Sequence, residues 1–523
     1  MRYTITFGGH RIIAMGGVNA EKNDYKGLYA YRTLIPSDGV YDLNVAPNEY
    51  VEGRGGRNQW GLYSYIGRLN YSFKGKYLLE MLGRRDGSSR FAQGYKWSNF
   101  YNVSAGWVLT NENFIRELGL EPLNYLKIRG GYGIMGNNVN IDLYDYISDV
   151  VIGNSVFGNS ASFQSAASLA RNGLTSLERT WERVKMANLG LDLILLRNRL
   201  SARFDYYKKR NDGMMIGVIY PGVLGGEAPQ KNSGVLDVKG WEAMVAWRDK
   251  IGEFNYNVSF NIADSRNKLV AYDGAVLPAA GLMPAIVGRP LNSWFMYATK
   301  GFFTDQKTVD LFYNKYTAIA QGNIPARTDD QVLRAGDTRK LDVDKNGYID
   351  QNDVKFKGDA APHYMFGLTL GASWKNIDVS TFLQGVAEQY IERTGWLAYP
   401  FVTEWANLNP SFLGKTWTPE NTGAKYPRLT VDPDRSKWNY QHNDFMLQNN
   451  RYVRLKSLIV GYTLPQSLIA RARLERVRVY FSGNDLFELT SIKDGFDPEQ
   501  GADSRLAGYP FMRTWSFGVN LGL

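Results

Sequence analysis

Apolar and polar side chains alternate along most of this chain, and a period of two residues is typical of strands. Residues 63–73 show the pattern best. One face would carry the apolar residues Tyr63, Tyr65, Leu69, Tyr71 and Phe73, while the other would carry Ser64, Arg68, Asn70 and Ser72, with Ile66 as the one apolar exception. An aromatic face opposite a polar face suits a strand that has lipid on one side and water on the other. The pattern therefore predicts an all-β protein, an antiparallel transmembrane β-barrel.

The same alternation recurs in about 15 segments. They are residues 1–7, 10–17, 63–73, 77–85, 101–109, 126–134, 187–195, 200–206, 241–247, 254–262, 366–374, 377–383, 454–462, 477–481 and 515–523. Short and long connections follow one another in turn, as expected of short periplasmic turns and long outer loops. If the chain ends on the periplasmic side, the outer loops are residues 21–59, 86–100, 137–185, 214–236, 268–363, 389–450 and 486–512. The connection 110–125 fits less well, since the alternation makes it periplasmic although it is not short.

Composition agrees with this fold and excludes several others. The chain has 34 Tyr, 25 Phe and 13 Trp, which suits aromatic girdles at the membrane surfaces, although a carbohydrate-binding all-β protein would also be aromatic-rich. No apolar run approaches the length of a spanning helix. There is no cysteine, which excludes disulfides and thiolate chemistry. The net charge of +10 is dispersed, so we expect no nucleic-acid partner.

Two readings of the strand pattern remain at this stage. A soluble β-sandwich or propeller, such as a carbohydrate-binding or glycan-degrading protein, would also alternate. Loops as long as 268–363 argue against a compact soluble domain.

The first residues, 1–7, resemble a strand and lack the features of a signal peptide. Either export depends on residues not present in the chain, or the protein is cytoplasmic.

Several short runs resemble SusC-like TonB-dependent outer-membrane transporters of Bacteroidetes, in the order found in that family. They are residues 76–79 (KYLL), 85–91 (RDGSSRF), Trp97, 106–107 (GW), 126–129 (LKIR), 136–137 (GN), 181–182 (WE), 188–192 (NLGLD), 232–234 (NSG), 240–242 (GWE), 336–337 (GD), 426–428 (YPR), 452–456 (YVRLK) and 461–462 (GY). Each run is weak evidence alone. Their common order over nearly the whole chain is strong evidence.

The resemblance implies a plugged barrel of about 22 strands, of which residues 1–523 would be the C-terminal portion, roughly strands 8 to 22. The signal peptide, the segment that engages TonB, the plug and the first strands would be absent, and Leu523 stands where the family usually ends in an aromatic residue. Without its early strands the chain would leave two sheet edges open, and unpaired backbone groups in lipid cost roughly several kcal/mol each. A truncated reading frame without activity is therefore a third hypothesis.

The resemblance also implies a function and partners. It implies energy-dependent uptake of glycans or peptides through the cell outer membrane, in contact with outer-membrane lipid. A SusD-like surface lipoprotein would cap the long loops, and the TonB complex would act through the plug. The loop residues Trp294, Trp396, Trp405 and Trp417 could stack on sugars, although packing within the loops is the expected role of each.

The loop 268–363 contains a motif that resembles a twelve-residue calcium loop. Oxygen-bearing side chains stand at positions 1, 3, 5, 9 and 12, and Gly347 stands at the sharp turn. The predicted calcium ligands are Asp342, Asp344, Asn346, the Tyr348 carbonyl, Asp350 and Asp353. The last position is Asp where Glu is usual, and no amphipathic helices are evident on either side, so the affinity would be weak. The alternative is an acidic turn held by side-chain hydrogen bonds.

No catalytic constellation is evident, and we expect the protein not to be an enzyme. His10, His363 and His442 are far apart and read as surface or loop residues. The glycine-rich residues 130–133 lack the helix and lysine of a phosphate loop. Glu80, Asp205 and Glu242 fall on polar strand faces, where a polar barrel interior explains them.

Overall fold

The computed structural model of the chain describes residues 1–33, 39, 42–45, 51–139, 141–144, 146–147, 150–157, 164–171, 175–217, 230–274, 278–316, 324, 332–403, 408–501 and 511–522. Trp405 and Leu523, both named by the sequence analysis, lie outside these residues.

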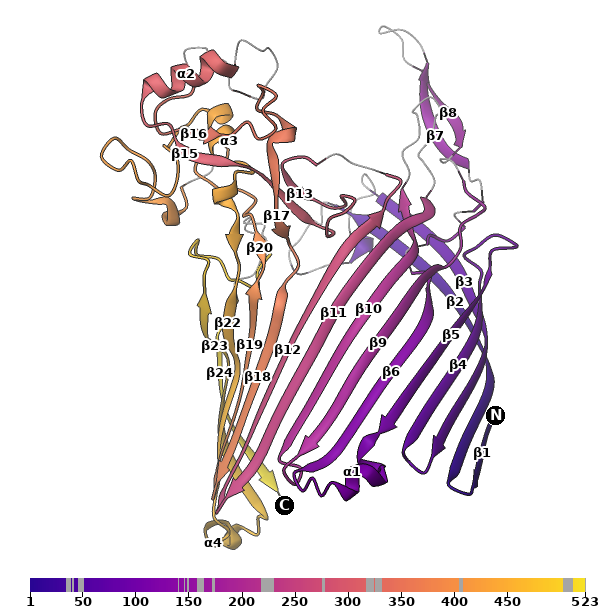
Figure 1. Cartoon of the computed structure of the whole chain (residues 1–523). Helices are drawn as coiled ribbons and strands as arrows, with labels where there is room; N and C mark the ends of the chain where they lie inside the picture. The colour runs from indigo at the N-terminus through magenta and orange to yellow at the C-terminus, as the bar shows by residue number, and fades with distance from the viewer. Residues whose placement is uncertain are drawn as a thin grey trace.

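One antiparallel sheet of 15 strands dominates the described structure, and each strand pairs with the next member of the sheet along the chain. The strands are β1 (Arg2–Phe7), β2 (His10–Arg32), β3 (Val51–Phe73), β4 (Tyr77–Ser88), β5 (Trp97–Val108), β6 (Leu123–Asn137), β9 (Glu182–Leu195), β10 (Leu200–Gly217), β11 (Gln230–Ile251), β12 (Phe254–Ala271), β18 (His363–Trp374), β19 (Ile377–Glu388), β22 (Tyr452–Thr463), β23 (Arg476–Thr490) and β24 (Thr514–Gly522). Figure 1 shows them as a curved wall of tilted strands, and β1 and β24 are its two edges.

Each predicted strand overlaps one of the 15 strands of this sheet, so the predicted strand pattern is confirmed. The predicted boundaries were wrong where strands extend far beyond the alternating segments. Strands β2 and β3 pair from His10–Phe73 to Arg32–Val51, through residues expected to form an outer loop. These extensions are rich in glycine and charge, and cross-strand contacts such as Arg57 Nη2 to Asp24 Oδ2 at 2.7 Å help to hold them. Hydrogen bonds between main chains do not require an apolar face. The strands therefore continue beyond the residues whose apolar and polar side chains alternate.

The connections differ sharply between the two ends of the wall. The turns after β1, β3, β9, β11 and β18 are short, and they lie at the same end as α1 (Asn113–Glu117) and α4 (Gln466–Ile469) (Figure 1). The opposite end carries the long connections, with the remaining helices and small sheets. The alternation of short and long connections expected from the sequence is therefore present. The connection 110–125 is indeed the longer, partly helical exception among the first turns.

The elements outside the large sheet are short. They are η1 (Leu43–Val45), η2 (Leu109–Asn111), β7 (Val150–Phe157), β8 (Gln164–Arg171), β13 (Gly281–Met283), β14 (Ser293–Tyr297), β15 (Thr299–Phe302), α2 (Gln306–Tyr316), β16 (Thr338–Lys340), η4 (Gln351–Asp353), β17 (Val354–Asp359), β20 (Tyr390–Ile391), η5 (Pro410–Phe412), α3 (Pro433–Tyr440), η6 (Asp444–Met446), β21 (Gln448–Asn449) and η7 (Ala470–Ala472). Within the described residues, no helix is long and apolar enough to cross a bilayer.

The two faces of the wall have different chemistry. In register across seven neighbouring strands, one row consists of Tyr71, Leu79, Ala105, Gly130, Leu189, Tyr206 and Trp241. One residue further along, the opposite face carries Arg129, Gly190, Asp205 and Glu242 in register. Tyr63, Trp107 and Phe260 remain exposed on the apolar face and are not packed into a closed interior. One face is thus suited to lipid and the other to water.

Two long connections, β12 to β18 and β19 to β22, form a body that we call the loop cap. Its largest apolar core contains Phe303, Val309, Phe312, Tyr313, Tyr316, Leu333, Ile349 and Trp438. The two connections are joined by hydrogen bonds, such as Trp438 Nε1 to the Thr338 carbonyl at 2.8 Å and the Thr338 amide to Asn439 Oδ1 at 2.8 Å. The loop cap has a buried core of its own, beside a wall whose apolar side chains are exposed.

Candidate functional site

The acidic loop of residues 342–353 is folded back on itself within the loop cap. Oxygen atoms of Asp342, Asp344 and Asp353 all lie within 4.8 Å of one another. Gly347 has a φ of 89°, which a residue with a side chain rarely adopts. Ile349 is only 1% exposed and belongs to the apolar core of the cap. The buried isoleucine therefore fixes the loop to the cap while its carboxylates converge.

The electrostatics of the three carboxylates suit a cation. Asp353 is fully buried and accepts hydrogen bonds from the amides of Val343, at 2.5 Å, and Asp350, at 2.8 Å. Burial raises the pKa of Asp353, and the neighbouring charges of Asp344 and Asp342 raise it further. Asp342 Oδ1 is buried without a hydrogen-bond partner. An oxygen ligand left without a partner beside two other carboxylates fits a hard divalent cation such as Ca²⁺.

The other predicted ligands have different roles in this conformation. Asn346 Oδ1 accepts the amide of Tyr348 at 2.7 Å, and Asp350 Oδ1 accepts the amide of Asn352 at 2.7 Å as the cap of η4. These are the hydrogen bonds expected of the alternative, an acidic turn. The structure thus brings together the carboxylates of Asp342, Asp344 and Asp353. Asp342 and Asp344 also accept amides of the turn, from Gly347 and Asn346, each at 3.1 Å. Asn346, Asp350 and the segment around Tyr348 shape the turn. Among the described residues, this is the one acidic, histidine or cysteine group with metal-site spacing.

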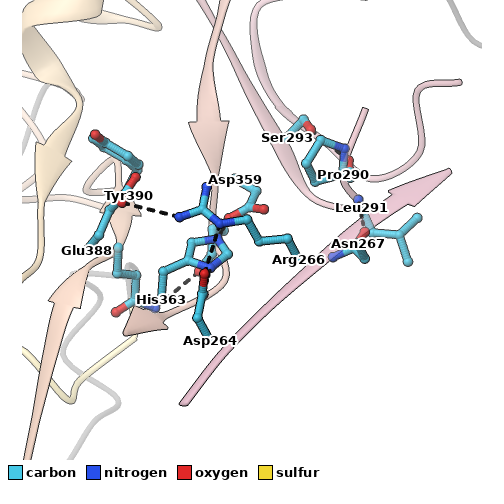
Figure 2. Close-up of polar contacts among 12 residues, drawn as sticks. Asp264, Arg266, Asn267, Pro290, Leu291, Ser293, Asp359, His363, Glu388 and Tyr390 are labelled. Atoms are coloured by element: carbon cyan, nitrogen blue, oxygen red, sulfur yellow. Dashed lines mark hydrogen bonds and ion pairs between the residues drawn. The ribbon is translucent and has the colours of Figure 1, made fainter. Parts of the chain in front are cut away.

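A second polar cluster lies where the loop cap meets the wall (Figure 2). His363, at the start of β18, is 4% exposed. Its Nδ1 lies 2.7 Å from Asp264 Oδ1 of β12, and its Nε2 lies 2.9 Å from Asp359 Oδ1 of β17. Arg266 Nε donates to Asp264 Oδ2 at 3.0 Å. Both ring nitrogens face carboxylate oxygens, so an imidazolium would satisfy both contacts as a double donor.

The expectation that the histidines are surface or loop residues was wrong for His363. The reason is that the two carboxylate partners of His363 come from different segments. Asp264 lies 99 residues earlier, in the wall, and Asp359 lies 4 residues earlier, in the loop cap. His442 Nδ1 contacts Glu392 Oε2 at 2.8 Å, and His10 Nδ1 contacts the Tyr71 hydroxyl at 2.9 Å. The signal available in the sequence was Asp264, an acidic residue two positions beyond the alternating segment 254–262.

The polar face of the wall carries a branched ion-pair cluster that the sequence analysis did not identify. The Arg129 guanidinium contacts Asp205 Oδ1 at 2.6 Å and Asp192 Oδ2 at 3.1 Å, and Arg203 also reaches Asp192, at 3.1 Å. The guanidinium lies over Gly190, where an added Cβ would come within 2.5 Å of it. A side chain at this position would require the guanidinium to move, so the glycine leaves room for the ion pairs.

The loop tryptophans have unequal access to a ligand. Trp294 is buried and donates its Nε1 to the Tyr390 carbonyl at 2.7 Å. Trp417 is buried against Gly336. Trp396 is 47% exposed. Trp294 and Trp417 thus pack within the cap, whereas Trp396 can meet a ligand from solution.

Known proteins match all or most of the length of this chain. It is 27% identical to the TonB-dependent receptor P3 of Formosa agariphila over 100% of this chain and 51% of that receptor. It is 25% identical to the TonB-dependent receptor SusC of Bacteroides thetaiotaomicron over 88% of this chain and 43% of that receptor. No family model matches the chain. The resemblance to SusC-like TonB-dependent receptors is confirmed, and the chain spans about half the length of these curated relatives.

Solved structures agree on the fold. The RagAB peptide importer in its closed-closed state matches 99% of this chain and 54% of its own chain, with a TM-score of 0.79 and 22% sequence identity. Its open-open state matches with a TM-score of 0.77. The chain therefore has the fold of an outer-membrane β-barrel portion, as predicted. The curated relatives are named as receptors, which supports the expectation that the chain is not an enzyme.

Proposed function

We propose that this chain forms most of the barrel wall and the outer loops of a TonB-dependent transporter that imports a peptide or glycan nutrient across the outer membrane. The observation that carries the proposal is the two-faced wall of 15 strands, with one apolar face and one face lined by ion pairs. A hydrated oligomer can pass along charged and amide groups, while the apolar face contacts lipid.

The loop cap is the proposed docking region for a SusD-like surface lipoprotein. It extends from the end of the wall opposite the short turns (Figure 1), and it has its own apolar core. A body of this kind can keep its shape while a partner covers it. Energy would come from the TonB complex, acting through a plug inside the wall.

Uptake assays in cells that carry or lack the gene test this proposal. Labelled oligopeptides and labelled oligosaccharides are supplied separately, with and without a protonophore that removes the energy source. The expected result is that loss of the gene abolishes uptake of one of the two classes, and that the protonophore has the same effect. Unchanged uptake of both classes would contradict the proposed transport function.

We also propose that the acidic loop binds Ca²⁺ weakly at the outer surface, through Asp342, Asp344 and Asp353, with Asn346, the Tyr348 carbonyl and Asp350 joining after a rearrangement of the turn. Calcium near 1 mM, on the order of extracellular levels, would suffice for a site of this type. Calorimetric titration with CaCl₂ tests it, with D342N as the variant and D310N, on α2 and outside the acidic loop, as the matched control. Absence of heat for the unmodified protein at roughly millimolar calcium would remove the site.

The soluble carbohydrate-binding alternative fits the structure less well. A soluble protein rarely exposes a large contiguous apolar surface. The exposed row of Tyr77, Trp107, Ile128 and Leu191, in register across β4, β5, β6 and β9, would have to be covered. A protein that stays monodisperse in plain buffer without detergent would restore that alternative.

A further inference from the structure

Two connections at the turn end are longer than tight turns: the one between β22 and β23, which contains α4 and η7, and the one between β5 and β6. The β5–β6 connection exposes more large apolar side chains. It contains η2 and the single-turn helix α1 and lies at the turn end of the wall (Figure 1). Phe114 is 51% exposed, Leu118 63% and Leu120 48%. Three large apolar side chains within seven residues are thus exposed on a segment that a tight turn could have replaced.

The base of this connection is held firmly against the wall. Glu112 is buried and accepts hydrogen bonds from Lys76 Nζ, at 2.8 Å, and Trp107 Nε1, at 3.0 Å. Hydrogen bonds from Lys76, Tyr77 and Trp107 lower the pKa of Glu112 to about 2, so it is ionised at neutral pH. Asn111 Nδ2 donates to the Gly75 carbonyl at 2.9 Å, which ties the segment to the neighbouring turn. These contacts hold residues 111 and 112 against the wall, next to the exposed apolar side chains.

The exposed side chains continue a row of aromatic rings on the apolar face. Ring centroids of Phe73 and Tyr77 are 6.4 Å apart, those of Tyr77 and Trp107 are 6.3 Å apart, and those of Trp107 and Phe114 are 6.5 Å apart. The first three rings sit at the ends of β3, β4 and β5, where the girdle of a membrane barrel is expected. Phe114 extends that row from the strands onto the connection.

We infer that the β5–β6 connection is an interfacial membrane anchor, with Phe114, Leu118 and Leu120 in the acyl boundary of the periplasmic leaflet. The occupant is phospholipid, because the segment is continuous with the ring row that the proposed function already places in lipid. Arg116, on α1, and Lys74, in the neighbouring turn that Asn111 contacts, are exposed cations that can meet headgroup phosphates. This inference rests on the membrane placement in the proposed function.

These 523 residues contain no cysteine, so a single cysteine introduced among them allows a site-specific test. Single variants F114C and L118C are labelled with an environment-sensitive fluorophore in the full protein as isolated from membranes and returned to vesicles of phosphatidylethanolamine and phosphatidylglycerol. Quenching by lipids with a nitroxide at the headgroup or along the chain is compared with quenching by aqueous iodide. E117C, on the same helix, is the polar control. The labels at 114 and 118 should emit at shorter wavelength than the label at 117 and be quenched more by lipid nitroxide than by iodide.

Two further labels separate this inference from the proposed function. Val103 and Ser104 are adjacent on β5 and face opposite sides of the wall, so V103C should be quenched by chain nitroxide and S104C should not. If V103C is not quenched by lipid, the membrane placement fails, and the anchor fails with it. If V103C is quenched while F114C and L118C respond to iodide as E117C does, only the anchor is overturned. Protection of F114C and L118C from both quenchers would indicate a protein partner and would also overturn the lipid anchor.

Discussion

The wall and the loop cap are stabilised in different ways. Neighbouring strands of the wall are joined in long, mostly unbroken ladders, and the wall leaves large side chains such as Leu189 and Tyr206 exposed. The cap buries side chains such as Phe303, Tyr313 and Leu333 completely, as a water-soluble domain does. The difference shows that the solvent around each region determines which of its groups must be buried or paired. In lipid every backbone polar group must be paired, while apolar side chains can face outward. In water apolar side chains are buried, while exposed backbone groups can bond to water.

The largest expected effect is a core truncation in the cap. Phe303 is fully buried and its ring packs against Phe312 at 5.1 Å, so F303A should destabilise the cap by about 3–5 kcal/mol. Hydrogen exchange measured by mass spectrometry should show faster exchange in the cap and unchanged protection in the wall. The matched control is F204A, which removes an exposed ring from the apolar face of β10. Equal effects of the two variants would contradict a separate cap core.

A charge on the apolar face of the wall should have the next largest effect. L189R places a cation on the apolar face of the wall, which contacts lipid, at a cost of roughly 2–4 kcal/mol near the bilayer centre. N188R, one residue away, faces the polar side and should cost much less. The measurement is urea unfolding in vesicles, followed by the gel-mobility shift of folded barrels. Equal destabilisation by both variants would argue that the two faces share one environment.

The junction between the regions should respond to loss of His363. H363L leaves Asp264 and Asp359 buried, each with one hydrogen-bonding partner removed, which should cost about 1–3 kcal/mol. The effect should appear as faster exchange at both β17 and the adjoining end of β18. H363Q retains an amide donor toward one of the two carboxylates and should recover part of the loss. A cap that loosens without any change at the end of β18 would show that the cluster does not couple the regions.

The smallest effect concerns the acidic loop and its pH dependence. Because the pKa of Asp353 is raised in the folded loop, its contribution favours folding at low pH, and it is lost as pH rises through the raised pKa. Calcium favours the ionised carboxylates, so it should offset this loss, by about 1.4 kcal/mol at ten times the dissociation constant. Thermal unfolding of the cap with and without CaCl₂ across acidic to neutral pH measures the difference. In D342N the two curves should coincide.

Much of the wall could be predicted because its strands are marked by a pattern of side chains within a few residues. Alternation along residues such as 63–73 reports directly which face meets lipid, and each strand pairs with a neighbour in chain order. The extended ends of β2 and β3 could not be predicted, since main-chain pairing there has no side-chain period to report it. The acidic loop was visible as a spacing of oxygen-bearing residues, but that spacing alone fits both a cation site and an acidic turn held by side-chain hydrogen bonds.

The sequence by itself determined the fold class, the two faces of the wall and the place of the acidic loop, because these depend on the order of side chains over a few residues. Only the tertiary structure decided that Asp264, Asp359 and His363 meet, that Arg129 joins Asp192 to Asp205, and that Phe114 extends the ring row of Trp107. The physical reason is that these contacts depend on strand register and on how the connections fold back. Both are set by the summed pairing and packing of many residues, which no short segment encodes.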